Sequence, residues 1–133
     1  IDRGLCLLVC AVTGDTERDA HWLADKIATL RVFEDADGAT NLALADVGGQ
    51  VLLVPQFTLA AAWRHGRRPS FTRAAAPEAA RPLVAAFAAR IAGHGFPAEE
   101  GPFGASMQVE LVNDGPFTLI LDSREGTGTS AAS

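Results

Sequence analysis

The chain has 133 residues, of which 48% are hydrophobic and 20% charged, and its formal net charge is −5. A chain of this length folds around one core and buries about two thirds of the surface of its unfolded form. No apolar run approaches the roughly 18 residues that a membrane span requires, and the first residues lack the pattern of a signal peptide. The composition therefore predicts a soluble cytoplasmic protein, and the negative charge by itself argues against a general nucleic-acid binder.

Positive charge is concentrated in one part of the chain. No acidic residue lies between Asp46 and Glu78. The window contains four arginines: Arg64, Arg67, Arg68 and Arg73. The remainder has seven basic residues (eleven minus four) against sixteen acidic ones, a balance of −9. Such a local patch suits a few phosphates better than a long duplex, because each neutralised phosphate adds its own salt-sensitive increment of affinity. A solvated arginine loop is the alternative interpretation.

The first predicted element is a buried strand in the apolar run 4–12, followed by a helix. Cys6 and Cys10 lie inside the run, where packing on one face is favoured over a disulfide or a metal site. Asp15 is the expected cap of the helix. The apolar face of the helix has a spacing of i, i+4 and i+7, at Leu23, Ile27 and Leu30.

Short strands are expected next. The pair Asp37-Gly38 predicts a hairpin between the apolar residues 32–33 and 42–44. Residues 51–54 should form a buried strand, and Pro55 should end it, bulge it or place it at an edge, because proline cannot donate a ladder hydrogen bond.

A second helix is predicted in the segment 76–95, with its stop at Gly93 or Gly95. Its apolar positions are Leu83, Phe87 and Ile91. Pro82 fits a first turn that starts near 79–81, or it kinks a helix that starts at Pro77.

Two further strands, 107–112 and 116–122, are expected around the turn at 113–115. Residues 1–123 thus form a single α/β domain with a mixed sheet and two helices packed on it, and 124–133 are expected to be a disordered tail.

Conventional catalytic motifs are absent from the sequence. The Gly-x-Ser-x-Gly elbow of many hydrolases and the P-loop do not occur. The three histidines, His21, His65 and His94, lack a second histidine or cysteine at ligand spacing and are interpreted as surface or helix-end residues, so no metal site is predicted. The remaining candidates for a catalytic site are backbone groups and a few hydroxyl side chains: Thr58, Ser70 and Thr118.

Four segments together resemble the D-aminoacyl-tRNA deacylases, the D-tyrosyl-tRNA deacylase family. They are PQFTL (55–59), GRRPSF (66–71), FGASMQVELVNDGPFT (103–118) and LDS (121–123), and the similarity runs from Gly4 to Ser123. The resemblance implies a three-layer β/β/α fold with mixed sheets and two main helices on one side. It also implies hydrolysis of the ester that joins a D-amino acid to tRNA, without a cofactor, in a homodimer with its active sites at the interface.

The resemblance assigns catalytic positions to Gln56, Phe57 and Thr58, which would bind the terminal adenosine and orient the ester through main-chain amides. A lone threonine hydroxyl is a poor nucleophile, so Thr58 is interpreted as a positioning group, and the ribose 2′-hydroxyl of the substrate would help to activate water. Simple strand packing is the alternative for Phe57 and Leu59.

The resemblance also implies a cis bond between Gly115 and Pro116, whose turn would present carbonyls that exclude the side chain of an L-amino acid. In the family this turn reaches the active site of the other subunit. Further pocket positions implied by the resemblance are Asn113, Thr118, Phe103, Gly104, Ala105 and Met107. A glycine turn that leads into a core strand explains residues 103–107 almost as well.

Arg64, Arg67 and Arg68 are assigned to the tRNA acceptor end by their charge. Two departures from the family are visible: a first strand with an arginine that braces the Gly-Pro turn has no counterpart before Ile1, and Pro55 replaces a typical serine. The chain is therefore expected to be truncated, to lack its start, or to be a divergent form. Alternatives are an impaired RNA-binding or dimerisation module, a deacylase for glycyl- or L-alanyl-mischarged tRNA, and an ordinary esterase.

Overall fold

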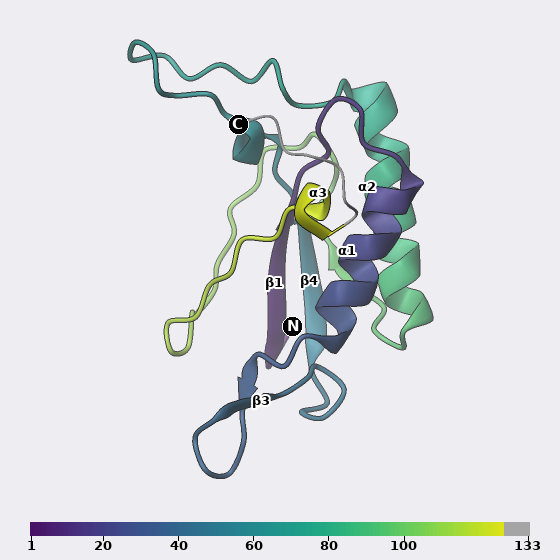
Figure 1. Ribbon diagram of the computed structural model, residues 1–133, viewed down its shortest axis with the longest axis vertical. Helices are drawn as coiled ribbons and strands as arrows, with labels where there is room; N and C mark the ends of the chain where they lie inside the picture. The colour runs from purple at the N-terminus through teal and green to yellow at the C-terminus, as the bar shows by residue number, and fades with distance from the viewer. Residues whose placement is uncertain (127–133) are drawn as a thin grey trace.

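A computed structural model describes residues 1–126 of the chain (Figure 1). Its elements, in chain order, are β1 (Gly4–Val9), α1 (Glu17–Thr29), β2 (Phe33–Glu34), β3 (Thr40–Leu42), β4 (Gln50–Pro55), the 3-10 helix η1 (Phe57–Ala60), α2 (Pro77–Gly93), β5 (Glu99–Glu100) and α3 (Ser123–Gly126). Within the described residues, no helix is long and apolar enough to cross a membrane.

The main sheet has three strands in the order β1-β4-β5, and both of its pairings are parallel. β1 and β4 pair in a continuous register from Gly4 opposite Gln50 to Val9 opposite Pro55. A parallel connection needs a crossover, and α1 supplies it between these two strands. Because β4 lies between two strands, its residues Val51 and Leu53 are fully buried, which confirms the predicted buried strand.

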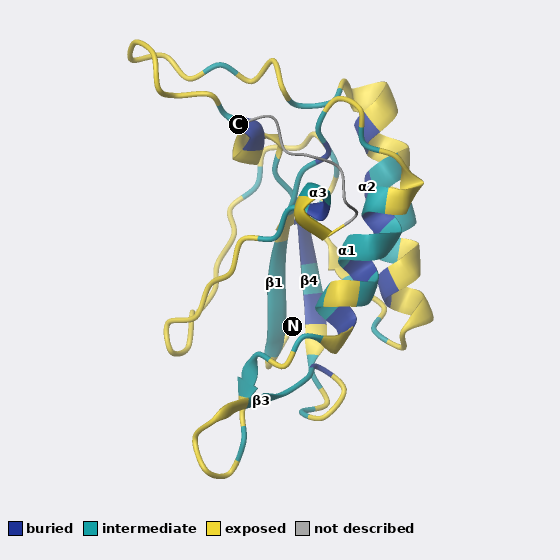
Figure 2. Cartoon of the chain, in the orientation of Figure 1, coloured by how far each residue is buried: buried dark blue, intermediate teal, exposed yellow. Residues whose placement is uncertain are grey.

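Both long helices cover one side of this sheet (Figure 1). The core lies between the sheet and the helices: Figure 2 shows buried residues on β4 and on the facing sides of α1 and α2. Alanines 20 and 24 of α1 and the side chains of Val84, Phe87 and Ile91 of α2 belong to this core. Small residues on α1 let the helix approach α2 closely. The expected mixed α/β fold with two helices on one side is confirmed.

The predicted hairpin is also present. β2 and β3 pair antiparallel, Gly38 takes a positive φ of 80°, and the Asp35 carboxylate accepts the N–H groups of Asp37 and Ala39. A positive φ at this position is easy only for glycine, which explains the Asp-Gly signal.

The structure decides where the two long helices, α1 and α2, begin. The cap of α1 is Thr16, which forms a capping box with Asp19, whereas Asp15 accepts the N–H of Val12 at 2.8 Å. The expectation for Asp15 was wrong by one residue because both neighbours are capping types. α2 starts at Pro77 and contains Pro82, so the second of the two alternatives for its start is correct.

The segments 107–112 and 116–122, expected as strands, belong to no strand of the described chain. They run as two extended arms on the side of the sheet away from the helices, joined by a turn (Figure 1). Their apolar side chains are exposed, up to 91% for Val112 and 95% for Ile120. Alternating apolar residues predict an extended chain correctly, but a strand also needs a ladder partner, and none lies among residues 1–126.

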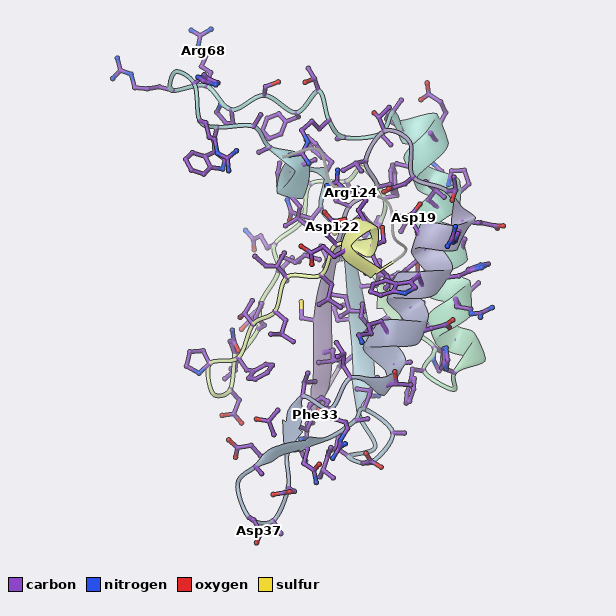
Figure 3. The ribbon with its side chains drawn as sticks, viewed as in Figure 1. Asp19, Phe33, Asp37, Arg68, Asp122 and Arg124 are labelled. Carbon is purple, nitrogen blue, oxygen red and sulfur yellow. The ribbon has the colours of Figure 1, made fainter. Side chains whose placement is uncertain are left out.

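The first residues of the predicted disordered tail belong to a short helix. Residues 123–126 form α3, so the boundary placed after Ser123 was wrong for these residues; the rest of the predicted tail lies outside the described residues. Ser123 is buried and donates a hydrogen bond to Asp19 of α1 at 2.8 Å, and Arg124 pairs with Asp122 at 2.7 Å (Figure 3). The Ser123–Asp19 hydrogen bond docks α3 on the start of α1.

Candidate functional site

The first part of the site is the segment that follows β4. Pro55 ends the strand, as expected, and the N–H of Gln56 donates to the Val9 carbonyl at 2.8 Å, which ties the segment to β1. The chain then turns into η1, where the N–H of Leu59 donates to the Gln56 carbonyl at 3.2 Å. The first N–H groups of a helix have no partner within it, so the amides at the start of η1 are available to a ligand.

The side chains of Phe57 and Leu59 point away from the core, whereas Ala60 is buried. Gln56 donates through Nε2 to the hydroxyl of Thr58, and Phe57 and Leu59 are 58% and 56% exposed. The strand-packing alternative for Phe57 and Leu59 is therefore wrong: they stand on a 3-10 helix at the surface. The Gln56 contact holds the Thr58 hydroxyl in one orientation, which suits a positioning group.

The thiol of Cys10 contacts the backbone of this segment. Its sulfur lies 3.6 Å from the Phe57 carbonyl and 3.4 Å from the Ala11 carbonyl, both of which accept from it. Burial raises the pKa of the Cys10 thiol, and a backbone hydrogen bond from Ala60 partly opposes this effect. The raised pKa favours the protonated thiol, the form that can donate to these carbonyls.

The Gly-Pro turn forms the second part. The bond between Gly115 and Pro116 is cis, as the resemblance implied. The Asn113 side chain accepts the N–H of Phe117 at 2.9 Å and donates to the Thr118 hydroxyl at 2.9 Å. Gly115 has a φ of 139°, and a Cβ there would lie 3.1 Å from the Phe117 nitrogen, so glycine is required. Asn113 and Thr118, expected to line a pocket, bond to the turn itself.

The third part is the segment 101–107, which leaves β5. Gly101 donates to the Leu53 carbonyl at 2.8 Å, and Phe103 packs partly against the core with the Arg81 guanidinium 4.6 Å from its ring centroid. Gly104 has a φ of 73°, which makes the turn after Phe103. A Cβ at Gly101 would lie 2.5 Å from the sulfur of Met107, so Met107 covers the edge of the sheet. Ala105 donates to the Pro102 carbonyl at 3.3 Å and closes the turn.

The fourth part is a projecting loop, residues 61–73, which we call the arginine arm. Two backbone hydrogen bonds between Ala62 and Ser70, of 2.7 and 2.8 Å, close it into a narrow loop. At its base, the rings of Phe57 and Phe71 make an edge contact at 5.3 Å, so the arm is fixed to η1. The three arginines expected to contact tRNA are all exposed on the arm, and Arg68 lies far from the body of the domain (Figure 3).

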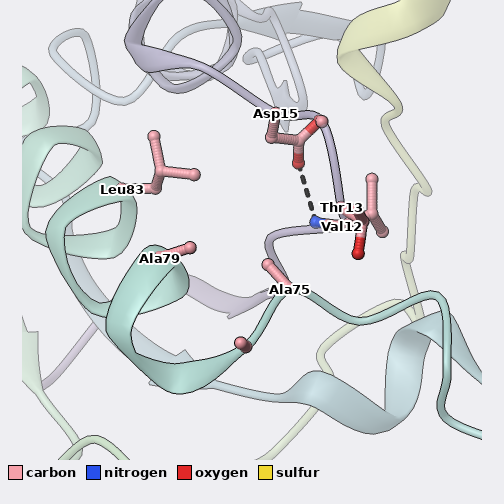
Figure 4. A pocket seen from close by; sticks show the side chains of 8 residues that line it. Val12, Thr13, Asp15, Ala75, Ala79 and Leu83 are labelled. Carbon is pink, nitrogen blue, oxygen red and sulfur yellow. Dashed lines mark hydrogen bonds between the residues drawn. The ribbon is translucent and has the colours of Figure 1, made fainter.

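The single chain does not bring all predicted residues together. The arginine arm adjoins η1, whereas the turn that joins the two extended arms lies at a distance from both (Figure 1). Two hollows of about 220 Å³ lie elsewhere. One is lined by Arg90, Gly93 and His94. The other lies between residues 12–15 and the start of α2 (Figure 4).

Neither hollow contains a predicted site residue. In the second, the only acidic side chain in the lining, Asp15, is occupied by the Val12 N–H. Nor do the described residues gather three or more His, Cys, Asp or Glu side chains that could hold a metal ion. His94 is a helix-end residue, as expected: it caps α2 and contacts Asp25 at 2.7 Å.

Two features of the site were not anticipated from the sequence. Trp63, on the arginine arm, is 69% exposed, and Cys10 bonds to the carbonyl of a candidate catalytic residue. Trp63 could have been found by its position, an aromatic residue directly before Arg64 in a window without acidic residues. No sequence signal pointed to the Cys10 contact, because it joins residues 47 positions apart.

Comparison with known proteins agrees with this architecture. The profile of the D-Tyr-tRNA(Tyr) deacylase family matches residues 1–122. A protein of Chloroflexus aurantiacus named D-aminoacyl-tRNA deacylase is 55% identical over 125 residues, which are 94% of this chain and 78% of the relative. A protein of Thermomicrobium roseum with the same name is 55% identical over 130 residues, or 98% of this chain and 84% of the relative.

Two solved structures are similar. One, described as a c-Myc DNA unwinding element binding protein, has a TM-score of 0.82 and 35% identity, covering 88% of this chain and 80% of its own. The other, described as a probable eukaryotic D-amino acid tRNA deacylase, has a TM-score of 0.60 over 76% of this chain and 74% of its own, with 14% identity, and shows the fold alone. The protein is thus a mixed α/β domain of the deacylase type. It belongs to the D-Tyr-tRNA(Tyr) deacylase family.

Proposed function

We propose that the protein hydrolyses the ester bond of D-aminoacyl-tRNA and releases a free D-amino acid and tRNA. The observation that carries this proposal is the family match over residues 1–122, which includes η1, the arginine arm and the Gly-Pro turn. Relatives more than half identical over nearly the whole chain bear the name of this activity. Because aminoacyl-tRNA is made and used in the cytoplasm, the enzyme is placed there.

Water is the nucleophile of the proposed reaction. It adds to the ester carbonyl, the bond between that carbon and the ribose oxygen breaks, and the ribose hydroxyl recovers a proton. Main-chain amides at the start of η1 face the developing oxyanion, where aligned donors are most effective. The hydrogen bond from Gln56 orients the Thr58 hydroxyl, and the neighbouring ribose 2′-hydroxyl helps to activate the water. A side-chain base is not needed for this arrangement.

Selection for the D-amino acid is assigned to the turn at Gly115 and Pro116. Carbonyls held close to the α-carbon leave room for its hydrogen on one side and exclude a side chain there. Asn113 supports this role because its two hydrogen bonds fix the turn across Phe117 and Thr118. Selection of this kind works by steric repulsion of the wrong substrate, so the carbonyls must be held rigidly.

A homodimer completes the proposed site, because the turn and η1 lie apart in one subunit (Figure 1). The two extended arms expose six large apolar side chains: Val109, Leu111, Val112, Phe117, Leu119 and Ile120. Exposed apolar surface on this scale is typical of an interaction surface, and the backbone of the arms, which pairs with no strand among residues 1–126, is able to join another sheet. The partner's turn would then reach η1 of this subunit.

The activity is tested by incubating the purified protein with D-Tyr-tRNA and L-Tyr-tRNA. Preferential hydrolysis of the D-ester is expected, whereas binding without turnover would identify an impaired RNA-binding module. Gly-tRNA and L-Ala-tRNA belong in the same assay, because Pro55 stands where the family has serine. A simple aryl ester tests for an ordinary esterase, and its faster hydrolysis would contradict the proposal.

The shared site is tested by mixing two inactive variants. One subunit carries Gln56→Ala and Thr58→Val, and the other carries Gly115→Val. After unfolding and refolding together, mixed dimers would contain one site with an intact η1 and an intact turn. Recovered hydrolysis of D-Tyr-tRNA is expected. Failure to recover activity, in a mixture shown by mass spectrometry to contain mixed dimers, would place both parts of the site in one subunit.

A further inference from the structure

The exposed indole of Trp63 is not used by the proposed hydrolysis. It lies on the arginine arm with 69% of its surface exposed, and the Arg64 guanidinium lies over its ring, 5.8 Å from the centroid. Leaving a large aromatic side chain in water forgoes a substantial free energy of burial, and tryptophan is enriched at interfaces, so Trp63 beside a cluster of arginines is a candidate contact residue.

The arm holds Trp63 at a defined place relative to η1. Backbone hydrogen bonds between Ala62 and Ser70 close the loop directly beside it, and the Phe57–Phe71 ring contact ties that loop to the candidate catalytic segment. Trp63 is five residues from Thr58, so the two Cα atoms are at most about 18 Å apart. A polymer that places its end at η1 therefore passes within reach of the indole.

The charge around Trp63 restricts the kind of polymer. Arg64, Arg67 and Arg68 lie on the same arm within five residues of Trp63, and no acidic residue occurs from position 47 to position 77. An apolar protein surface would leave these cations without partners. A single-stranded nucleic acid has both features that the arm complements, phosphates for the guanidinium groups and flat bases that stack on aromatic side chains. Bases within a duplex are already stacked and offer no free face.

We propose that Trp63 is a stacking platform for an unpaired base of the tRNA acceptor end, while the arginines of the arm contact the flanking phosphates. This inference rests on the proposed function, because that function brings the acceptor end to η1. The terminal adenosine carries the ester and occupies η1, so the base on Trp63 is one of the nucleotides that precede it. Trp63 is a substrate-positioning residue in this arrangement and takes no part in the chemistry.

Intrinsic fluorescence provides a binding test that is independent of activity. The chain has two tryptophans, so Trp22→Phe leaves Trp63 as the single emitter. The variant is titrated with a short RNA that ends in an unpaired CCA, with the same RNA abasic at the unpaired positions, and with a blunt hairpin. Quenching is expected with the unpaired bases, and weaker binding and little quenching with the other two. Equal quenching by the abasic RNA, or none by any RNA, would overturn the stacking.

Anisotropy of a labelled RNA repeats this comparison in the native chain, in case Trp22→Phe does not fold. Trp63→Ala should weaken binding of the unpaired RNA about tenfold, the effect of losing one base stack, and Trp63→Phe should retain most of the affinity. Equal losses in the alanine and phenylalanine variants would exclude a stacking role. These measurements require no hydrolysis, so they stand even if the proposed function fails.

Kinetics connects the stacking to the substrate. Trp63→Ala should raise KM for D-Tyr-tRNA about tenfold with little change in kcat, and its effect on D-tyrosyl adenosine, which has no preceding nucleotide, should be several-fold smaller. Equal losses on both substrates would overturn the proposal. Absence of hydrolysis by the wild-type chain on either substrate would count against the proposed function instead.

Discussion

The side-chain amide of Asn113 donates a hydrogen bond to the hydroxyl of Thr118 at 2.9 Å, across the turn formed by Gly115 and Pro116. The same side chain accepts the Phe117 N–H at 2.9 Å. One residue therefore closes the turn from both directions, and the shape of the turn depends on it.

Replacing Asn113 should reduce the discrimination between D- and L-substrates. Asn113→Ala removes both hydrogen bonds, each worth about 1 kcal/mol, so we expect the ratio of kcat/KM for D-Tyr-tRNA over L-Tyr-tRNA to fall about tenfold or more. Asn113→Asp is the matched control, because it keeps the acceptor for the Phe117 N–H. The ratio should fall less in this variant than in Asn113→Ala. An unchanged ratio in Asn113→Ala would separate the turn from stereoselection.

Removing two charges from the arginine arm should flatten the salt dependence of tRNA binding. The double variant Arg67→Ala, Arg68→Ala is expected to bind tRNA more weakly at low salt, with a log–log salt slope about one unit shallower for each phosphate that the arm no longer neutralises. The double variant Lys26→Ala, Arg31→Ala removes the same number of charges away from the arm, on α1 and on its connection to β2, and serves as the control for net charge. Equal slopes in the wild type and the double variant would remove the arm from the tRNA interface.

Two glycines should respond to alanine in opposite ways. A Cβ at Gly4 would lie 1.8 Å from the Gln50 carbonyl oxygen, within the pairing of β1 and β4, so Gly4→Ala should lower the free energy of unfolding by about 2 kcal/mol. At Gly93, the last residue of α2, nothing lies within 4 Å of the added carbon. Gly93→Ala should raise stability by up to about 1 kcal/mol. Urea denaturation measures both, and a tolerated alanine at position 4 would contradict the close strand pairing.

Acid should weaken the contact between α1 and α2 at Asp25. The Arg90 guanidinium and His94 hold the pKa of the Asp25 carboxyl well below its usual range. Because the folded-state pKa is depressed, the stabilisation is present above the ordinary aspartate pKa of about 3.9 and is lost as pH falls through the folded value.

Asp25→Asn provides the measurement for this contact. The wild type should have a slightly higher urea midpoint than Asp25→Asn near neutral pH, and the difference should shrink to zero in strong acid. Added salt should also reduce it, since the pair is exposed. A difference that does not change with pH would mean that Asp25 acts through packing alone.

Local rules predicted much of the framework. The Asp37-Gly38 hairpin and the end of β4 at Pro55 follow from backbone restrictions that operate within a few residues. The start of α1 was misplaced by one position because Asp15 and Thr16 have the same capping chemistry, and only the fold decides which of them caps the helix.

The roles assigned to the site residues rest on the family resemblance, which singled out Gln56, Thr58 and the Gly115-Pro116 bond and implied that the turn serves the other subunit. The structure confirms the cis bond and shows that η1 and the turn lie apart within one chain, which periodicity could not reveal. The strands expected at 107–112 and 116–122 illustrate the same limit. Their sequence encodes an extended backbone, whereas pairing depends on which other chain segment lies beside them.

The hydrogen bonds of the Gly-Pro turn all join residues between 113 and 118, so its conformation is encoded locally. A corner built in this way is ordered before any second molecule arrives. Docking in the proposed homodimer then loses little additional conformational entropy at the turn to which stereoselection is assigned. We accordingly expect the turn to keep its shape when the proposed subunits dissociate and associate again.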